Sequence, residues 1–137
     1  MIPKSQWIKR ILTDIKDVAD LDFQRRAWIE YDPKCICDFD ELISNLYNGS
    51  QFDEFIEKYE DTSEFPEKQM MLLKNLYDKI EEFYYKPEIY SFDYSEPCID
   101  CRKVFYNPDW HEIRLIAQEV LEAFKDFDIR EESENDT

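Results

Sequence analysis

The chain contains a single glycine, Gly49, among its 137 residues, and only six prolines. Glycine supplies the positive backbone angles of tight turns and lets a loop approach a phosphate closely. Its scarcity therefore argues against a β-sandwich with many tight turns and against a phosphate-binding loop. A chain of this length has room for one domain, and helices are the structure that its composition favours.

Long apolar runs are also missing. No segment approaches the roughly 20 apolar residues that cross a membrane. Residues 1–16 have neither the continuous apolar stretch nor the small-residue cleavage site of a signal peptide. We therefore expect a cytoplasmic protein, in which the four cysteines are reduced thiols more often than disulfides.

Catalytic motifs are absent, and histidine is scarce. The sequence holds no HExxH, GxSxG, P-loop or dinucleotide-binding fingerprint. A histidine base needs a nucleophile and an orienting carboxylate around it. The only histidine, His111, has Asp109 and Glu112 nearby in sequence, but these project from different sides of a helix. We interpret His111 as a surface residue and predict that the protein is not an enzyme.

Basic residues are outnumbered: 17 lysines and arginines face 33 acids, and the net charge is −16. A magnitude of about 2–8 suffices to keep a small domain soluble, and self-repulsion at higher charge costs stability. The charge argues against nucleic acid and anionic membranes as partners, because both are polyanions. It favours a basic protein partner. The alternative is that the acids serve solubility alone.

Aromatic residues, in contrast, are plentiful: 10 Phe, 9 Tyr and 3 Trp. Each such ring can bury roughly 150–250 Å², so few positions are needed to fill a small interior. We predict an unusually aromatic core.

Apolar residues recur at gaps of three and four along most of the chain, which predicts helices. One long stripe covers 7–19. A second helix is predicted over 63–84 and closed by Pro87, and the last is capped by Asn107 and extends over 108–124.

Shorter helices are predicted between these stripes. Asp20 is expected to cap a helix over 20–28, and Asp38 with Glu41 resembles a capping box at the start of a helix over 39–47. Gly49 is predicted to close that helix in the left-handed conformation, and a further helical turn or two follows it.

These elements define the expected fold class as mainly α, a compact bundle of about five to six helices with one long loop and room for a short strand pair. Residues 1–128 are predicted to form a single helical domain. Residues 129–137 are polar, and we expect a flexible acidic tail there.

The long loop spans residues 87–107, which show no helical period. Loops of this length are uncommon in compact domains and are usually functional or disordered. The alternation around 104–106 indicates a short strand. The aromatic residues of the loop argue against full disorder; they are Tyr90, Phe92, Tyr94, Phe105 and Tyr106.

The cysteines form two pairs, Cys35-x-Cys37 and Cys98-x-x-Cys101. Four thiolates could hold a structural zinc ion tetrahedrally. Against this, the first pair has one intervening residue where zinc sites commonly have two to four, and neither pair lies in a glycine-rich knuckle. Zinc, a disulfide and ordinary reduced thiols all stay open, and reduced thiols are the leading interpretation.

An acidic band between residues 53 and 67 is the strongest interaction candidate. Clustered carboxylates accept charge-assisted hydrogen bonds from Arg and Lys and attract a basic partner. The predicted partner-binding acids are Asp53, Glu54, Glu57, Glu60, Asp61 and Glu64. Aromatic residues can add the anchoring contacts that a charged surface lacks, and the predicted anchors are Tyr90, Phe92 and Tyr94.

A resemblance to a known group of proteins adds to this interpretation. Its motifs follow an N-terminal amphipathic helix and are Asp22-Phe23-Gln24-Arg25-Arg26-x-Trp28, an acidic helix with Leu46-Tyr47, a long helix with Gln69, and Asn107-Pro108-x-Trp110. This order resembles short acidic bacterial proteins found beside polymorphic toxins, including immunity proteins of contact-dependent growth inhibition systems. The likeness spans most of the chain. It implies binding and neutralisation of a cognate toxin and assigns no binding residues.

We therefore predict an immunity-type inhibitor that occludes the active site of a cognate basic toxin. A nuclease is the favoured class, because its cleft attracts phosphate and a carboxylate-rich surface can mimic phosphate. Two charges about 4 Å apart interact by about 4 kcal/mol at an effective dielectric near 20, before desolvation. The alternative function is a zinc-stabilised regulatory or scaffold module without a toxin partner.

Overall fold

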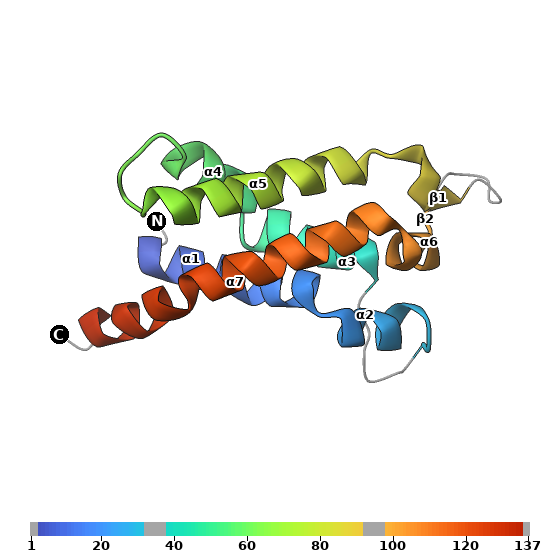
Figure 1. The fold of residues 1–137 in the computed structure, drawn as a ribbon, viewed down its shortest axis with the longest axis horizontal. Coiled ribbons are helices and arrows are strands. Elements are labelled where there is room, and N and C mark those ends of the chain that lie inside the picture. The colour runs from blue at the N-terminus through green and yellow to red at the C-terminus, as the bar shows by residue number, and fades with distance from the viewer. Residues whose placement is uncertain (1–2, 32–37, 92–97, 136–137) are drawn as a thin grey trace.

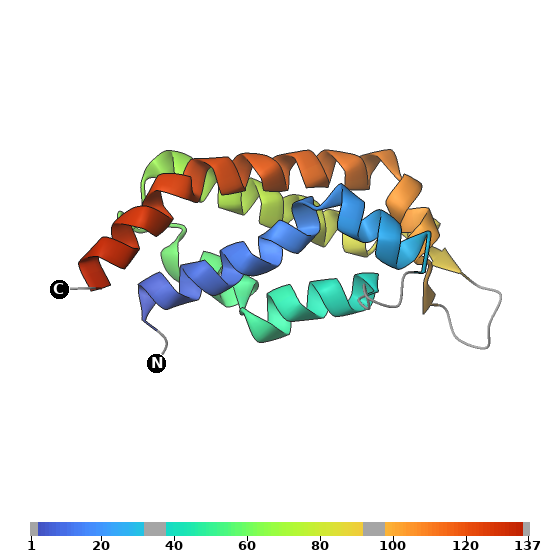
Figure 2. The same ribbon diagram turned by 90° about the horizontal axis from the view of Figure 1, so that it is seen from below.

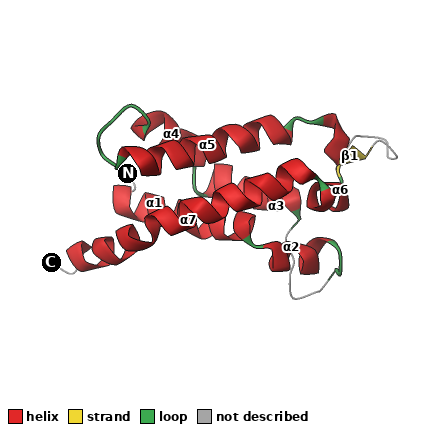
Figure 3. Ribbon diagram, viewed as in Figure 1, coloured by secondary structure: helices red, strands yellow, loops and turns green. Residues whose placement is uncertain are grey.

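The structure is a computed structural model that describes the backbone of residues 3–31, 38–91 and 98–135, with side chains up to residue 125. Within these ranges the chain forms seven α-helices and one two-stranded antiparallel sheet (Figure 3). This confirms the predicted mainly α bundle with a short strand pair. Nowhere in the described ranges is a helix both long and apolar enough to cross a membrane.

Three long helices run side by side along the molecule (Figure 1). They are α1 (Lys4–Ala19), α5 (Glu67–Tyr84) and α7 (Pro108–Asn135). Helix α7 packs against both α1 and α5. The apolar stripe predicted for α1 is buried along its whole length, from Trp7 to Ala19. Burial of such stripes is the main stabilising contribution to the bundle.

Helix α2 (Leu21–Trp28) begins where the sequence predicted a break. The Asp20 carboxylate accepts a hydrogen bond from the backbone N–H of Phe23 at 2.9 Å and caps the helix. Two arginines at its end pair with acids of the same chain: Arg25 with Asp22 and Glu30, and Arg26 with Asp22. Both arginines are therefore paired with carboxylates within the chain.

The next segment consists of α3 (Phe39–Ser44), the π-helical turn η1 (Asn45–Gly49) and α4 (Phe52–Tyr59). Figure 2 shows α3 and η1 on the side of α1 away from α7. The Asp38 carboxylate caps α3 by accepting from the Glu41 N–H at 2.7 Å, as predicted.

The prediction for Gly49 is wrong, because no described glycine has a positive φ and the left-handed residue is Gln51, at φ 54°. Contacts to α1 hold the chain here. The buried carbonyl of Ser50 accepts from the Trp7 indole N–H at 2.7 Å, and the Ser50 hydroxyl donates to Asp14. The sharp turn therefore comes after Ser50.

Helix α5 begins at Glu67, one turn later than the predicted start at Ser63, and ends at Tyr84, before Pro87. The preceding turn is held by Thr62, whose hydroxyl donates to the Tyr59 carbonyl at 2.9 Å and accepts from the Glu64 N–H at 3.3 Å. Burial of Phe65 delays the helix, because its ring is 97% buried between α4 and α7.

The predicted long loop contains four short elements: η2 (Pro87–Ile89), β1 (Tyr90–Ser91), β2 (Cys98–Ile99) and α6 (Cys101–Tyr106). Tyr90 pairs with Ile99 and Ser91 with Cys98. The predicted strand at 104–106 is wrong, since these residues belong to α6. The Asp100 carboxylate caps α6 by accepting from the Arg102 N–H at 2.9 Å, and Val104 is fully buried.

Helix α7 starts as predicted. The Asn107 side-chain oxygen accepts from the Asp109 N–H at 2.8 Å, and Pro108 is the first helical residue. The helix continues to Asn135, beyond the range of 108–124 that the sequence predicted for it and into the predicted tail. The backbone of the acidic tail is thus helical as far as it is described.

The core is aromatic, as predicted. Around Trp110, ring centroids lie 5.2 Å away for Phe39 and 5.4 Å for Phe83. Trp28 packs against both Phe39 and Trp110. Gln24 is fully buried beside them, and its side-chain oxygen accepts from the Trp110 indole N–H at 3.0 Å. The FQRRAW and NPDW stretches therefore meet in the core.

Candidate functional site

The predicted acidic band divides into two groups in the structure. Glu60 and Glu64 already have cations of the same chain, because Glu64 pairs with Lys4 at 2.8 Å and Glu60 with Lys74 at 3.8 Å. Lys74 also pairs with Asp78. A broad surface hollow of about 620 Å³ lies beside Lys74, so a cation of the chain is already present in it.

The remaining acids of the band lie on or just after α4. Glu54, Glu57 and Asp61 are exposed. Asp53, in the first turn of α4, is half-buried and close enough to Tyr47 and Tyr77 to raise the pKa of both phenols. Of the six predicted acids, Asp53 is thus the one that the fold brings beside a group of aromatic side chains.

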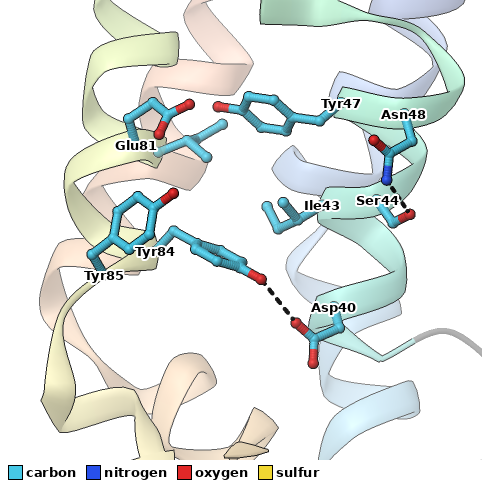
Figure 4. A pocket seen from close by; sticks show the side chains of 9 residues that line it. Asp40, Ile43, Ser44, Tyr47, Asn48, Glu81, Tyr84 and Tyr85 are labelled. Carbon is cyan, nitrogen blue, oxygen red and sulfur yellow. Dashed lines mark hydrogen bonds between the residues drawn. The ribbon is translucent and has the colours of Figure 1, made fainter.

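Tyr47 also lines a pocket between α3 and η1 on one side and α5 on the other, together with Tyr84 and Tyr85 (Figure 4). We call it the tyrosine–carboxylate pocket. Its volume is about 230 Å³. It is lined by Asp40, Ile43, Ser44, Tyr47, Asn48, Ile80, Glu81, Tyr84 and Tyr85.

Tyr47 reaches into this space from η1, and its hydroxyl points toward the α5 wall (Figure 4). The hydroxyl oxygen is buried, and no described residue forms a hydrogen bond with it. Burial raises the pKa of Tyr47 strongly, and the charges of Glu81 and Asp53 raise it further. The phenol therefore stays protonated.

Two tyrosines form the α5 wall. The Tyr84 hydroxyl donates to the Asp40 carboxylate across the pocket at 3.4 Å, and the Tyr84 ring stacks on Phe39. The neighbouring Tyr85 is 72% exposed and meets the Tyr84 ring edge-on, with centroids 5.4 Å apart. The pocket thus presents one fixed ring and one ring free to move.

Across the described ranges, no lysine or arginine forms an ion pair with the pocket carboxylates Asp40 and Glu81, or with Asp53 of α4. Burial raises the pKa of Tyr77, and the charge of Glu81 raises it further. Tyrosine faces attract cations, and charge-assisted hydrogen bonds to carboxylates are among the stronger ones. This arrangement therefore suits a positively charged group.

The predicted aromatic anchors lie partly at this pocket. Tyr90 is half-buried, and its hydroxyl donates to the Tyr84 carbonyl at 3.2 Å. The Asp40 charge, after burial, raises the pKa of Tyr90, so this ring borders the same group. Phe92 and Tyr94 lie outside the described residues.

Most of the pocket was not predicted from the sequence. Tyr47 and Tyr84 were assigned to apolar helix stripes, because aromatic residues at that spacing are usually core. The available signal is the spacing of Tyr77, Glu81 and Tyr84 or Tyr85, which places hydroxyls and a carboxylate on neighbouring turns of one helix.

The cysteines are only partly described. Cys98 is exposed, and Cys101 is half-buried; both are free thiols. The Cys101 sulfur accepts from the Phe39 N–H at 3.3 Å, and burial raises the pKa of this thiol. Cys35 and Cys37 lie outside the described residues. Within the described part of the chain, no three potential metal ligands gather, so the four-cysteine site stays a prediction.

His111 is exposed in the first turn of α7, as predicted. Its backbone N–H donates to the Asn107 carbonyl at 3.2 Å and so belongs to the helix start.

Comparison with known proteins gives no relative for this chain: no family model matches, and no curated protein or solved structure matches it significantly.

Proposed function

We propose that the protein is an immunity-type inhibitor that acts in the cytoplasm by binding a basic toxin and occluding its active site. A nuclease is the toxin class that fits best, since its cleft is built to attract phosphate. The tyrosine–carboxylate pocket is the part of the surface that we assign to the partner. The proposal is supported by the charge of −16 together with the pocket geometry.

The observation that carries the proposal is the absence of a cation beside Asp40 and Glu81 in the described ranges, although both line a tyrosine-rich pocket. Acids that serve only solubility have no need to flank a pocket. Two carboxylates on facing walls of one pocket repel each other. A basic side chain of a partner removes that repulsion on binding.

The exposed acids of α4 have a different role in this proposal. Glu54 and Glu57 lie in solvent, where single ion pairs contribute about 0–1 kcal/mol. Their field raises the association rate with a basic partner. The pocket then supplies the short-range contacts that keep the partner bound.

The test begins with capture of the partner by the tagged full-length chain in its native host. The captured protein is then expressed alone and together with the inhibitor. We expect a stoichiometric basic partner that arrests growth alone and is harmless with the wild-type chain. The D40N/E81Q variant should protect less than the control variant E112Q/E119Q. The control also removes two carboxylate charges, but from exposed positions on α7. A partner that is harmless alone, or equal protection by both variants, contradicts the proposal.

A zinc-stabilised regulatory or scaffold module is the second candidate. The observation in its favour is that the Cys101 sulfur contacts the backbone of Phe39, and Cys37 precedes Phe39 by two residues in the sequence. Structural zinc sites contribute directly to folding. One zinc ion per purified chain, with loss of the folded state on chelation, would support this module. Metal-free protein with unchanged thermal unfolding would exclude it.

A further inference from the structure

The walls of the tyrosine–carboxylate pocket carry acceptors at opposite positions. Asp40 and Tyr47 come from α3 and η1, while Glu81 and Tyr84 come from α5 (Figure 4). Asp40 is already bridged to the Tyr84 hydroxyl at 3.4 Å, which is a long hydrogen bond. The carboxylate therefore keeps acceptor capacity for an additional donor.

A cation is the chemical class that this pocket accepts. The negative faces of the tyrosine rings and the two carboxylates all favour positive charge. An anion in the pocket would be repelled at short range by the carboxylates of Asp40 and Glu81. A purely apolar group would cover Asp40 and Glu81 without donating to either, and a polar atom that becomes buried without a partner is costly.

The arrangement favours a guanidinium over an ammonium group. A guanidinium is planar, stacks on aromatic faces and carries five N–H donors in a fixed fork. The pocket offers both features, with tyrosine faces beside acceptors that belong to separate walls. An ammonium group is a compact, strongly hydrated charge, and it cannot stack while donating in several directions.

We propose that the tyrosine–carboxylate pocket receives one arginine side chain of the partner. Its guanidinium donates to the carboxylates of Asp40 and Glu81, while a tyrosine ring covers its face. The identity of the partner as a toxin rests on the proposed function. The affinity of the pocket for a guanidinium does not, and it can be measured without any partner.

The test is a titration of the ¹⁵N-labelled full-length chain with N-acetyl-arginine-N-methylamide, followed by backbone NMR shifts. The matching lysine and citrulline derivatives are the controls, because citrulline has the shape of arginine without its charge. We expect saturable shifts in residues 40–48 and 80–85 with the arginine probe. Binding should be severalfold weaker with lysine and undetectable with citrulline.

Variants connect these shifts to the named side chains. D40N/E81Q should weaken arginine binding by about tenfold or more, since each charge-assisted hydrogen bond contributes on the order of one decade in affinity. E112Q/E119Q should bind like the wild type. Y47F retains the ring and should weaken binding less. If D40N/E81Q loses its folded spectrum, the single variants D40N and E81Q give the same comparison.

Three results would overturn the proposal: shifts outside the pocket, equal binding of arginine and lysine derivatives, or unchanged binding by the pocket variants. The two proposals can fail separately. Arginine binding without any toxic partner would retain the pocket assignment and remove the immunity function. A toxic partner that binds D40N/E81Q as tightly as the wild type would retain the immunity function and remove the arginine pocket.

Discussion

The side chain of Gln24 joins α1, α2 and α7. Its amide N–H groups donate to the Asp17 and Val18 carbonyls, both at 2.8 Å, and its oxygen accepts from Trp110. The last carbonyls of α1 lack helical partners, and Gln24 satisfies two carbonyls near this end. In the sequence, Gln24 is distinguished only as part of the motif over residues 22–28. Its role depends on Trp110, which is 86 positions away.

Asp14 gives a residue-scale prediction about pH. Its carboxylate accepts from the Ser50 hydroxyl, and burial raises its pKa. Burial also raises the pKa of Asp17, and the charges of Asp14 and Asp20 raise it further. The folded state therefore binds these protons more tightly than the unfolded state. The resulting stabilisation is fully present below the ordinary Asp pKa of about 3.9 and is lost as the pH rises through the folded value.

Replacing Asp14 with Asn retains an acceptor for Ser50 and removes the half-buried charge. The free energy of unfolding of Asp14→Asn should therefore exceed that of the wild type by an amount that grows between about pH 4 and pH 7. Urea unfolding followed by circular dichroism at several pH values measures this difference. A difference that shrinks or stays constant as the pH rises would show that Asp14 is not desolvated in the folded state.

At the scale of elements, the turn between η1 and α4 allows two interpretations of Gly49 to be distinguished by substitution. If Gly49 had the left-handed conformation, replacing it with alanine would lower the free energy of unfolding. In the structure Gly49 has a negative φ, and a Cβ atom there would meet no heavy atom within 4 Å. We therefore predict that Gly49→Ala raises the free energy of unfolding by about 0.5–1 kcal/mol, because glycine is costly inside a helix.

Gln51 provides the matched comparison for this measurement. It occupies the left-handed region at φ 54° and ψ 49°, where a side chain costs about 1–2 kcal/mol. Gln51→Gly relieves that strain, whereas Gln51→Ala does not. Chemical denaturation of the three variants compares them directly. If Gly49→Ala destabilised the protein, this would show that Gly49 has the left-handed conformation and would contradict the turn described above.

The elements that could be predicted are those with long apolar stripes. In α1, α5 and α7 the period repeats over several turns, so Ile8, Leu73 and Ile113 identify the buried face without knowledge of the partner helix. Helix α6 spans only six residues. Fewer than two turns cannot establish a period, so the alternation around Val104 indicated a strand instead. Its cap at Asp100 was the one local signal of a helix.

The pocket could not be predicted, because it depends on how elements pack. Tyr47, Tyr84 and Ile80 all follow helical spacing, and nothing in the sequence distinguishes a ring that ends in the core from one that lines a hollow. The acidic band was visible from composition. Packing then paired Glu60 and Glu64 with lysines and placed Asp53 beside Tyr47.

At the scale of the whole molecule, ion pairs between elements neutralise only part of the acidic excess. Lys4, Lys74 and Lys86 each pair with a carboxylate of another element. With 33 acids against 17 bases, at least 16 acids cannot be neutralised within the chain. Their mutual repulsion costs stability. A basic partner lowers that cost wherever it binds. The tyrosine–carboxylate pocket adds a position that can enclose a positively charged side chain of the partner.

The central claim is that the pocket, and not the net charge alone, binds the partner. The most direct measurement is the affinity of the captured partner for the wild-type chain, D40N/E81Q and E112Q/E119Q, determined by calorimetry at one salt concentration. Both variants remove two charges. The account predicts that D40N/E81Q loses about tenfold or more in affinity, whereas E112Q/E119Q stays within about twofold of the wild type. Equal losses in the two variants would show that the partner responds only to the overall charge.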